Sequence, residues 1–384
     1  MLNLPDFPWD TLAEAKARAA SHPEGIVDLS VGTPVDPTPE SVRQALAQAG
    51  DAHGYPQTWG TPDLREAVAA WFARRRGVPD LDPDGVLPTV GSKEFVAWLP
   101  LMLGLGHSDV VAFPAIAYPT YDVGARLAGA TPAPYAGLAE LTALNPAPAL
   151  VWINSPSNPT GAVAEVEELR EIVRWARQVG ALVVNDECYA ELDWRDGHSG
   201  SPRPCGAPSL LDPRVCEGSH EGLIACYSLS KQSNLAGYRA AFAAGDPVLI
   251  DRLLQVRKHA GMMMPWPVQR AMLAALSDDE HVSAQIEIYR RRRELLAPAL
   301  QHAGLRISHS QAGLYLWASM GMDARETVRL LAERGILVAP GDFYGAAGQS
   351  HVRVAITATD DRIQAAAQRC EQREPLGSQG RPVA

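Results

Sequence analysis

Lysine supplies only four of the 34 basic side chains in this 384-residue chain, and one of the four, Lys231, stands in a distinctive setting. It ends the run Ser228-Leu229-Ser230-Lys231, directly after the apolar stretch 223–227, and Arg239 follows eight residues later. A lysine amine can lose its proton and form a Schiff base with an aldehyde, which a guanidinium in a protein does not do. The hydroxyls of Ser228 and Ser230 and the Arg239 guanidinium can bind a phosphate. This combination predicts a covalent anchor for pyridoxal phosphate. A surface lysine in a polar turn is the alternative.

A carboxylate ends a second apolar run. Asp186 follows Val183-Val184-Asn185, and Tyr189 comes three residues later. A buried aspartate at a strand end can pair with the pyridine nitrogen of that cofactor, and the ring then withdraws electrons. A nearby phenol can donate a hydrogen bond to the ring oxygen O3′. We therefore predict Asp186 and Tyr189 as site residues. A helix-capping aspartate beside a packed tyrosine would give the same pattern.

Two turns after apolar runs add further candidates. Asn158 lies in 154–161, where two prolines and a glycine restrict the backbone, so its amide can be held toward a ring oxygen. An ordinary turn is the alternative. Ser92 and Lys93 follow Gly91 at the predicted start of a helix, where backbone N–H groups favour a phosphate. Lys93 competes with Lys231 as the anchor but lacks the flanking hydroxyls and arginine.

An aromatic and an arginine complete the candidate site. Tyr118 follows the strand-like run 109–113, so its ring can stack on a pyridine face. Core packing is the alternative for Tyr118. Arg353 stands in the middle of the β-patterned run 351–356, where a buried guanidinium needs an anion. The planar fork suits the α-carboxylate of a substrate, and a structural salt bridge is the alternative.

Short β-branched runs alternate with longer amphipathic segments over the first two thirds of the chain. The strand-like runs are 86–90, 109–113, 149–154, 181–186, 223–228 and 240–244, and the helix-like segments between them include 62–76, 92–105, 165–179 and 247–259. This alternation predicts an α/β fold with a largely parallel sheet covered by helices on both sides. Ligands of such sheets bind at the carboxyl ends of the strands, where all the candidates fall.

The pattern of strand-like and helix-like segments changes near residue 279. We predict a large domain over 43–280, a smaller α/β domain built from 1–42 and 281–372, and a disordered tail over 373–384. The segment 196–222, rich in Gly, Pro, Ser and His, predicts a long surface loop. The cluster Arg290-Arg291-Arg292-Arg293 predicts a solvated helix face.

Composition narrows the function class. The net charge of −10 argues against nucleic acid or an anionic membrane as a partner. No apolar run is long enough to span a bilayer, and the first ten residues do not resemble a secretory signal, so we expect a cytoplasmic protein. The five cysteines form no Cys-x-x-Cys pair, and no histidine pairs with a carboxylate at helical ligand spacing, so we predict no metal site.

Taken in order, these motifs resemble the fold-type I pyridoxal phosphate enzymes, and among them the class I/II aminotransferases. The resemblance runs from the segment 29–34 to Arg353 and includes Tyr55 with the run 60–65. It implies a large domain with a mostly parallel seven-stranded sheet, a smaller α/β domain, and a homodimer that uses amino acids and 2-oxo acids, with active sites at the interface.

The resemblance also implies a role for each matching residue. Lys231 forms the Schiff base and moves the Cα proton, Asp186 pairs with the pyridine nitrogen, and Tyr189 and Asn158 bind O3′. Tyr118 stacks on the ring, and Tyr55 reaches the phosphate of the neighbouring subunit. Arg353 binds the α-carboxylate, and Gly32 lies near the substrate. The phosphate is bound by Ser92, Lys93 (through its backbone), Ser228, Ser230 and Arg239. Ping-pong kinetics through pyridoxamine phosphate follow.

Three segments, 91–94, 228–239 and 257–265, are similar to the actinobacterial-type succinyldiaminopimelate aminotransferases of lysine biosynthesis. That family exchanges an amino group between glutamate and N-succinyl-2-amino-6-oxopimelate. Methionines 262–264 either line a substrate channel or pack in a dimer interface.

The alternative functions are another class I/II aminotransferase (aromatic, alanine or aspartate), a pyridoxal phosphate β-lyase, and a non-catalytic sensor of the cofactor. A Rossmann-type nucleotide binder is disfavoured because no Gly-x-Gly-x-x-Gly follows the first strand.

Overall fold

The structure, a computed structural model, describes residues 4–195, 206–371 and 376. Its larger sheet has seven strands in the order β2-β8-β7-β6-β5-β3-β4. These strands are β2 (Val86–Val90), β3 (Val110–Pro114), β4 (Thr131–Tyr135), β5 (Leu150–Asn154), β6 (Leu182–Asp186), β7 (Leu223–Ser228) and β8 (Ala240–Gly245). Neighbouring strands run parallel except in the two pairs that involve β8. The predicted mostly parallel seven-stranded sheet is confirmed.

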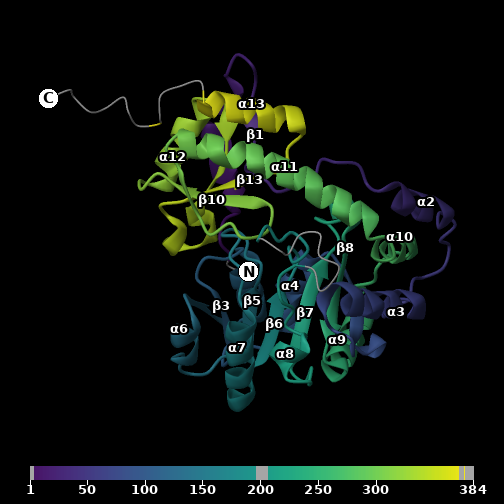
Figure 1. The fold of residues 1–384 in the computed structure, drawn as a ribbon. Coiled ribbons are helices and arrows are strands. Elements are labelled where there is room, and N and C mark those ends of the chain that lie inside the picture. Colours follow the sequence, from purple (N-terminus) through teal and green to yellow (C-terminus); the bar gives the residue numbers. More distant parts are fainter. Residues whose placement is uncertain (1–3, 196–205, 372–375, 377–384) are drawn as a thin grey trace.

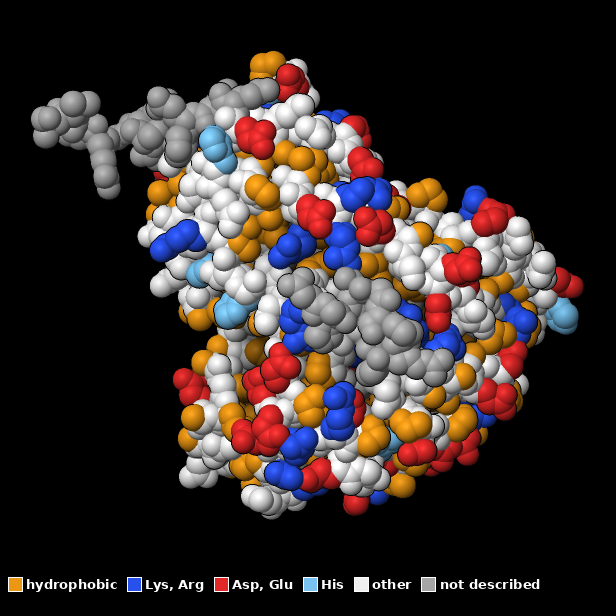
Figure 2. Space-filling model, in the orientation of Figure 1, with side chains coloured by type: hydrophobic (Ala, Val, Ile, Leu, Met, Phe, Trp, Pro, Cys, Tyr) orange, Lys and Arg blue, Asp and Glu red, His pale blue; other side chains and the backbone are white. Residues whose placement is uncertain are grey.

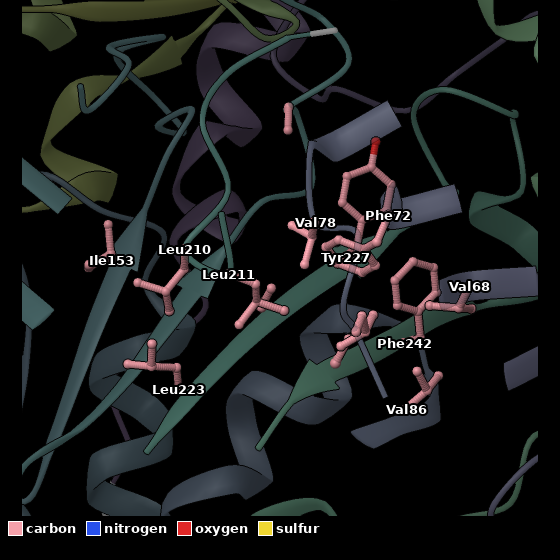
Figure 3. Packing of buried hydrophobic residues seen from close by; sticks show 14 of the residues in the cluster. Val68, Phe72, Val78, Val86, Ile153, Leu210, Leu211, Leu223, Tyr227 and Phe242 are labelled. Carbon is pink, nitrogen blue, oxygen red and sulfur yellow. The ribbon is translucent and has the colours of Figure 1, made fainter. Parts of the chain in front are cut away.

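Both faces of this sheet are buried, because successive side chains of a strand point to opposite faces. In β5, Val151 and Ile153 face one hydrophobic cluster, whereas Leu150 and Trp152 face another. Figure 3 shows part of the first cluster, where Tyr227 and Phe242 of the sheet meet Phe72. The first cluster includes side chains of α2 (Glu40–Gln48), α3 (Pro62–Trp71), α7 (Val166–Val179), α8 (Pro213–Cys216) and α10 (Trp266–Leu276), and the second includes those of α4 (Ser92–Met102), α5 (Thr120–Ala128) and α9 (Pro247–Ala260).

The reversed direction of β8 has a direct effect on the site. The first residue of β8, Ala240, lies opposite Val90 at the end of β2, and Ala241 lies opposite Ser228 at the end of β7. The start of β8 is therefore at the edge of the sheet where the parallel strands end. Arg239, which directly precedes β8, is brought to the same edge as the residues that follow β5, β6 and β7.

The other strands form two small sheets, drawn above the larger one in Figure 1. Antiparallel β12 (Ala339–Pro340), β13 (Val352–Ala355), β10 (Tyr315–Ser319) and β9 (Arg306–Ser308) make one, and parallel β1 (Val27–Asp28) and β11 (Ile336–Leu337) make the other. The accompanying helices are α1 (Ala13–Ala20), α11 (Glu280–His302), α12 (Ala324–Ala332) and α13 (Asp360–Glu371), while the short α6 (Leu138–Thr142) follows β4.

The limits of the two predicted domains stay a prediction. Of the predicted tail, 373–384, only Leu376 lies among the described residues, and its N–H donates to the Ala303 carbonyl at 3.0 Å.

The predicted long surface loop is wrong for 207–212, which are largely buried, whereas 217–221 are mostly exposed as predicted and 196–205 lie outside the described residues. Leu210 and Leu211 are fully buried and lie close to Leu223 of β7 (Figure 3). The buried Glu187 carboxylate accepts hydrogen bonds from the Leu210 N–H at 2.7 Å and the Ser209 hydroxyl at 3.0 Å. The polar composition of this segment suggested exposure to water, but its polar groups instead donate hydrogen bonds to the buried Glu187 carboxylate.

Removal of that carboxylate should destabilise the protein. Glu187 also accepts from the Asn185 side-chain amide at 3.2 Å and pairs with the buried Arg76 guanidinium at 3.2 Å, so Glu187→Ala leaves a buried cation and three donors without this acceptor. We expect the free energy of unfolding to fall by about 3–5 kcal/mol, measured by urea denaturation followed through tryptophan fluorescence. Glu217→Ala, which breaks the exposed pair with Arg174, is the control and should change far less. Equal effects of the two substitutions would contradict this account.

The prediction of a solvated arginine face is wrong for Arg292. This side chain is buried and pairs with Asp36 at 2.6 Å and with Asp360 at 2.6 Å. Elsewhere on the face drawn in Figure 2, acidic and basic side chains are interspersed rather than gathered by sign. None of the described helices combines the length and apolar character needed to cross a membrane.

Candidate active site

A cavity of about 490 Å³ lies at the carboxyl edge of the larger sheet. The structure brings together there every predicted site residue except Tyr55. These residues are Gly32, Ser92, Lys93, Tyr118, Asn158, Asp186, Tyr189, Ser228, Ser230, Lys231, Arg239 and Arg353. Tyr55 is 95% exposed, and its predicted contact with a neighbouring subunit stays a prediction.

Lys231 lies in the turn after β7, inside the cavity. Its Nζ donates a hydrogen bond to the Gly32 carbonyl oxygen at 2.5 Å. Loss of water around the amine lowers the pKa of Lys231, and the nearby Arg353 and Arg239 guanidinium groups lower it further. A lysine with a lowered pKa has more of its amine in the neutral form that reacts with an aldehyde. Lys93 is exposed, whereas the Lys231 amine is shielded from water inside the cavity, so burial favours Lys231 as the anchor.

The groups that could hold a phosphate converge from three segments. The Ser228 hydroxyl donates to the Ser230 hydroxyl at 2.8 Å, and α4 begins at Ser92. Gly91 has φ +80°, and a Cβ there would come within 2.1 Å of Arg239 Nη2, so only glycine lets the guanidinium lie against this turn. Arg239 itself has φ +56°, a conformation that costs a non-glycine residue about 1–3 kcal/mol. A cation, two hydroxyls and a helix start fit the phosphate of pyridoxal phosphate.

Asp186 is held at the end of β6 by a residue that the sequence analysis missed. The Tyr121 hydroxyl donates to Asp186 Oδ2 at 2.9 Å, and the Cys188 N–H donates to Oδ1 at 3.2 Å. Burial raises the pKa of Asp186, and these hydrogen bonds oppose the rise. A buried carboxylate with few cations near it suits a protonated pyridine nitrogen as its partner. The sequence did contain a signal for Tyr121, because it lies three residues beyond the predicted site residue Tyr118. In the structure the centroids of these two rings are 6.5 Å apart and the rings meet edge to face.

Arg353 enters the cavity from β13 of the four-stranded sheet. It donates to Asn158 Oδ1 at 2.9 Å and to the Ser30 carbonyl at 2.7 Å, and it has no carboxylate partner in the described part of the chain. The alternative of a structural salt bridge is therefore not observed there. The Arg353 Nε is buried without a hydrogen-bond partner among the described atoms. A buried guanidinium with free donor capacity fits a substrate carboxylate.

Tyr315 of β10 is the second residue that the sequence analysis missed. The Arg353 guanidinium carbon lies 3.9 Å from the centroid of its ring, and its hydroxyl is 3.2 Å from that of Tyr189. A Cβ on Gly32 would come within 2.1 Å of the Tyr315 hydroxyl, so Gly32 makes room for this phenol. The Arg353 and Lys231 charges lower the pKa of Tyr315 against the opposing effect of burial. The sequence around Tyr315 does not indicate which side chains of this strand face the site.

Methionines 262–264 do not line the cavity. Met264 is fully buried in the core of this same chain, so neither expected role, substrate channel or dimer interface, describes it. Within the described ranges, no group of three or more His, Cys, Asp or Glu residues is arranged to hold a metal ion.

Comparison with known proteins gives the family. The sequence profile described as "Aminotransferase class I and II" matches residues 24–370. The 4-dedimethylamino-4-oxo-anhydrotetracycline transaminase OxyQ of Streptomyces rimosus is 58% identical over 369 residues (96% of this chain, 99% of the relative). A probable aminotransferase of Mycobacterium tuberculosis is 57% identical over 365 residues (95% and 84%). The solved structure of a probable N-succinyldiaminopimelate aminotransferase from Thermus thermophilus has a TM-score of 0.82 at 32% identity (95% and 100%). Because a family profile and relatives of high identity cover nearly all of it, the chain belongs to the pyridoxal phosphate-dependent class I and II aminotransferases.

Proposed function

We propose that the protein exchanges an amino group between glutamate and N-succinyl-2-amino-6-oxopimelate, as a homodimer in the cytoplasm. The observation that carries this proposal is the charge of the cavity. Lys93, Lys231, Arg239 and Arg353 line it against a single carboxylate, Asp186. This excess of positive charge suits a phosphorylated cofactor together with substrates that bear several carboxylates. The named function of the Thermus thermophilus protein supports the same substrate class.

In this proposal each residue has one task. Arg239, Ser228, Ser230 and the N–H groups of residues 92–93 would hold the phosphate. Asp186 would pair with the pyridine nitrogen, Asn158 and Tyr189 would bind O3′, and Tyr118 would stack on the ring. Pyridoxal phosphate, when bound, supplies an acceptor for the electron pair left at Cα. Arg353 would hold the α-carboxylate, and Lys231 Nζ would take up the proton released from Cα. Two half-reactions then share one site.

A diode-array experiment tests the proposal. Purified enzyme loaded with pyridoxal phosphate is mixed with glutamate and, separately, with N-succinyl-LL-2,6-diaminopimelate. Loss of the visible cofactor band with both, reversed by 2-oxoglutarate, is the expected result. A response to glutamate alone would keep the aminotransferase and reject this acceptor. The high identity to the tetracycline-pathway transaminase makes a bulky ketone the second candidate in that case. No response to either substrate would favour a β-lyase or a sensor.

Asp186→Asn should separate stability from activity. Because burial raises the pKa of Asp186 above its unfolded value, the ionised carboxylate destabilises the cofactor-free fold as the pH rises through that raised pKa. We expect the cofactor-free variant to melt at a higher temperature than the wild type at pH 8, with the gap closing as the pH is lowered. Transamination by the loaded variant should fall by about 100-fold or more, because the pyridine nitrogen loses its charged partner. A lower melting temperature at pH 8 would refute this explanation.

A further inference from the structure

A second hollow opens beside the active-site cavity. This groove, about 960 Å³ in volume, shares Phe7, Trp9, Lys93 and Tyr118 with the cavity. The two spaces therefore adjoin each other at these four side chains, with Lys93 on the border between them. A substrate with a long side chain, held at its reacting end in the cavity, can extend into this groove.

The walls of the groove are largely apolar. Phe113, Val123, Phe343 and Tyr344 are among them, together with several prolines. Such a surface favours methylene groups, which gain free energy when they leave water. The groove thus suits an aliphatic or acyl chain more than a short polar side chain.

The other basic groups of the groove already have carboxylate partners. Arg126 Nε donates to Asp122 at 2.7 Å, and Arg325 Nε donates to Asp342 at 2.8 Å. Asp6 is the remaining acid in the lining.

Lys93 differs from these two arginines. It is exposed, its Nζ lies 5.7 Å from the ring centroids of both Phe7 and Tyr118, and it has no carboxylate partner in the described part of the chain. Its ammonium group therefore stands at the junction of the two spaces with its charge unpaired.

The proposed function leaves one positive charge in the cavity without a task. Arg239 is matched by the cofactor phosphate, Arg353 by the α-carboxylate, and Lys231 by the aldehyde, so Lys93 remains. We propose that the Lys93 ammonium binds the terminal carboxylate of the N-succinyl group of the acceptor, while the groove receives the acyl chain. This inference rests on the proposed function and makes Lys93 a specificity-determining residue. The backbone N–H of Lys93 keeps its separate role at the phosphate.

The test compares two substrates that differ in one carboxylate. N-succinyl-LL-2,6-diaminopimelate carries the terminal carboxylate, and N-acetyl-LL-2,6-diaminopimelate lacks it. Lys93→Met should lower kcat/KM for the succinyl substrate by about tenfold more than for the acetyl substrate, as expected for a charge-assisted contact near solvent. Lys93→Arg should retain the preference. Asp6→Asn, which removes the one lining acid that has no ion pair within the described ranges, should act in the opposite direction and raise kcat/KM for the succinyl substrate.

Binding provides a readout without turnover. In a Lys231→Ala background, Lys93→Met should weaken binding of the succinyl compound by about tenfold more than binding of the acetyl compound in isothermal titration calorimetry. Equal losses for both compounds, or loss of the cofactor, would assign Lys93 to the phosphate site and overturn the proposal. If the wild type uses the succinyl substrate and Lys93→Met has no effect on it, the subsite is rejected while the proposed function stands. Failure of the wild type to use either compound would reject the proposed function and the subsite with it.

Discussion

Lys231→Ala should abolish transamination and the visible absorption of the bound cofactor together. The substitution removes the amine that bonds to the aldehyde and the base that moves the Cα proton, and general acid–base catalysis alone contributes about 10²–10⁴-fold. We therefore expect kcat to fall by at least about 10⁴-fold. Stopped-flow mixing with glutamate measures the rate, and an absorbance spectrum of the loaded protein measures the bond.

The control for this prediction keeps the positive charge. Lys231→Arg retains a cation beside the Gly32 carbonyl but forms no Schiff base, so it should be as inactive as the alanine variant. Lys93→Ala should retain the visible band. A band that survives in Lys231→Ala and disappears in Lys93→Ala would place the anchor at Lys93.

Arg353→Ala should raise KM strongly for every amino acid donor. Removal of one partner of a buried charge-assisted contact costs about 2–5 kcal/mol, which corresponds to roughly 30-fold to several thousand-fold in affinity. The effect should be common to all donors because they share the α-carboxylate. Half-reaction kinetics with glutamate over a wide concentration range measure it.

Arg353→Lys is the matched variant for this prediction. It preserves the charge but not the fork that bonds to Asn158 and Ser30, so part of the loss should remain. The visible cofactor band should be unchanged in both variants, since Arg353 lies outside the phosphate and pyridine contacts. A rise in KM below tenfold in Arg353→Ala, or loss of the band, would contradict the assigned role.

Strong local patterns made most of the larger sheet predictable. The buried strands β5, β6 and β7 are continuous apolar runs that end in polar residues, which is typical of parallel strands covered on both faces. The edge strand β4, Thr-Pro-Ala-Pro-Tyr, was missed because proline argues against a strand, yet an edge position tolerates it. The direction of β8 could not be deduced, because residue alternation is the same in parallel and antiparallel strands.

Most of the predicted site residues lie at or just after the end of an apolar strand or at a helix start, whereas Arg353 lies inside β13 and was found because a charge is unusual in a β-patterned run. Tyr121 and Tyr315 were missed because they lie within elements, where a tyrosine and a core aromatic have the same pattern. Only their partners, Asp186 for Tyr121 and Arg353 for Tyr315, distinguish them from packing residues. Partners so far apart in the chain are set by tertiary structure and have no local signature. The same reasoning applies to Arg292, whose two acids lie at Asp36 and Asp360.

The turn from β7 into β8 carries the lysine near its beginning and the phosphate-binding arginine at its end. Both strands are fixed by pairing over their whole length, so the number of residues between them alone sets how far apart these two groups lie. Insertion or deletion of one residue would either move Arg239 away from Gly91 or shift the register of β8, and a one-residue shift turns every side chain of a strand to the opposite face. In relatives that keep the cofactor, the length of this turn should therefore be constant, together with Ser230, Lys231 and Arg239, which it carries.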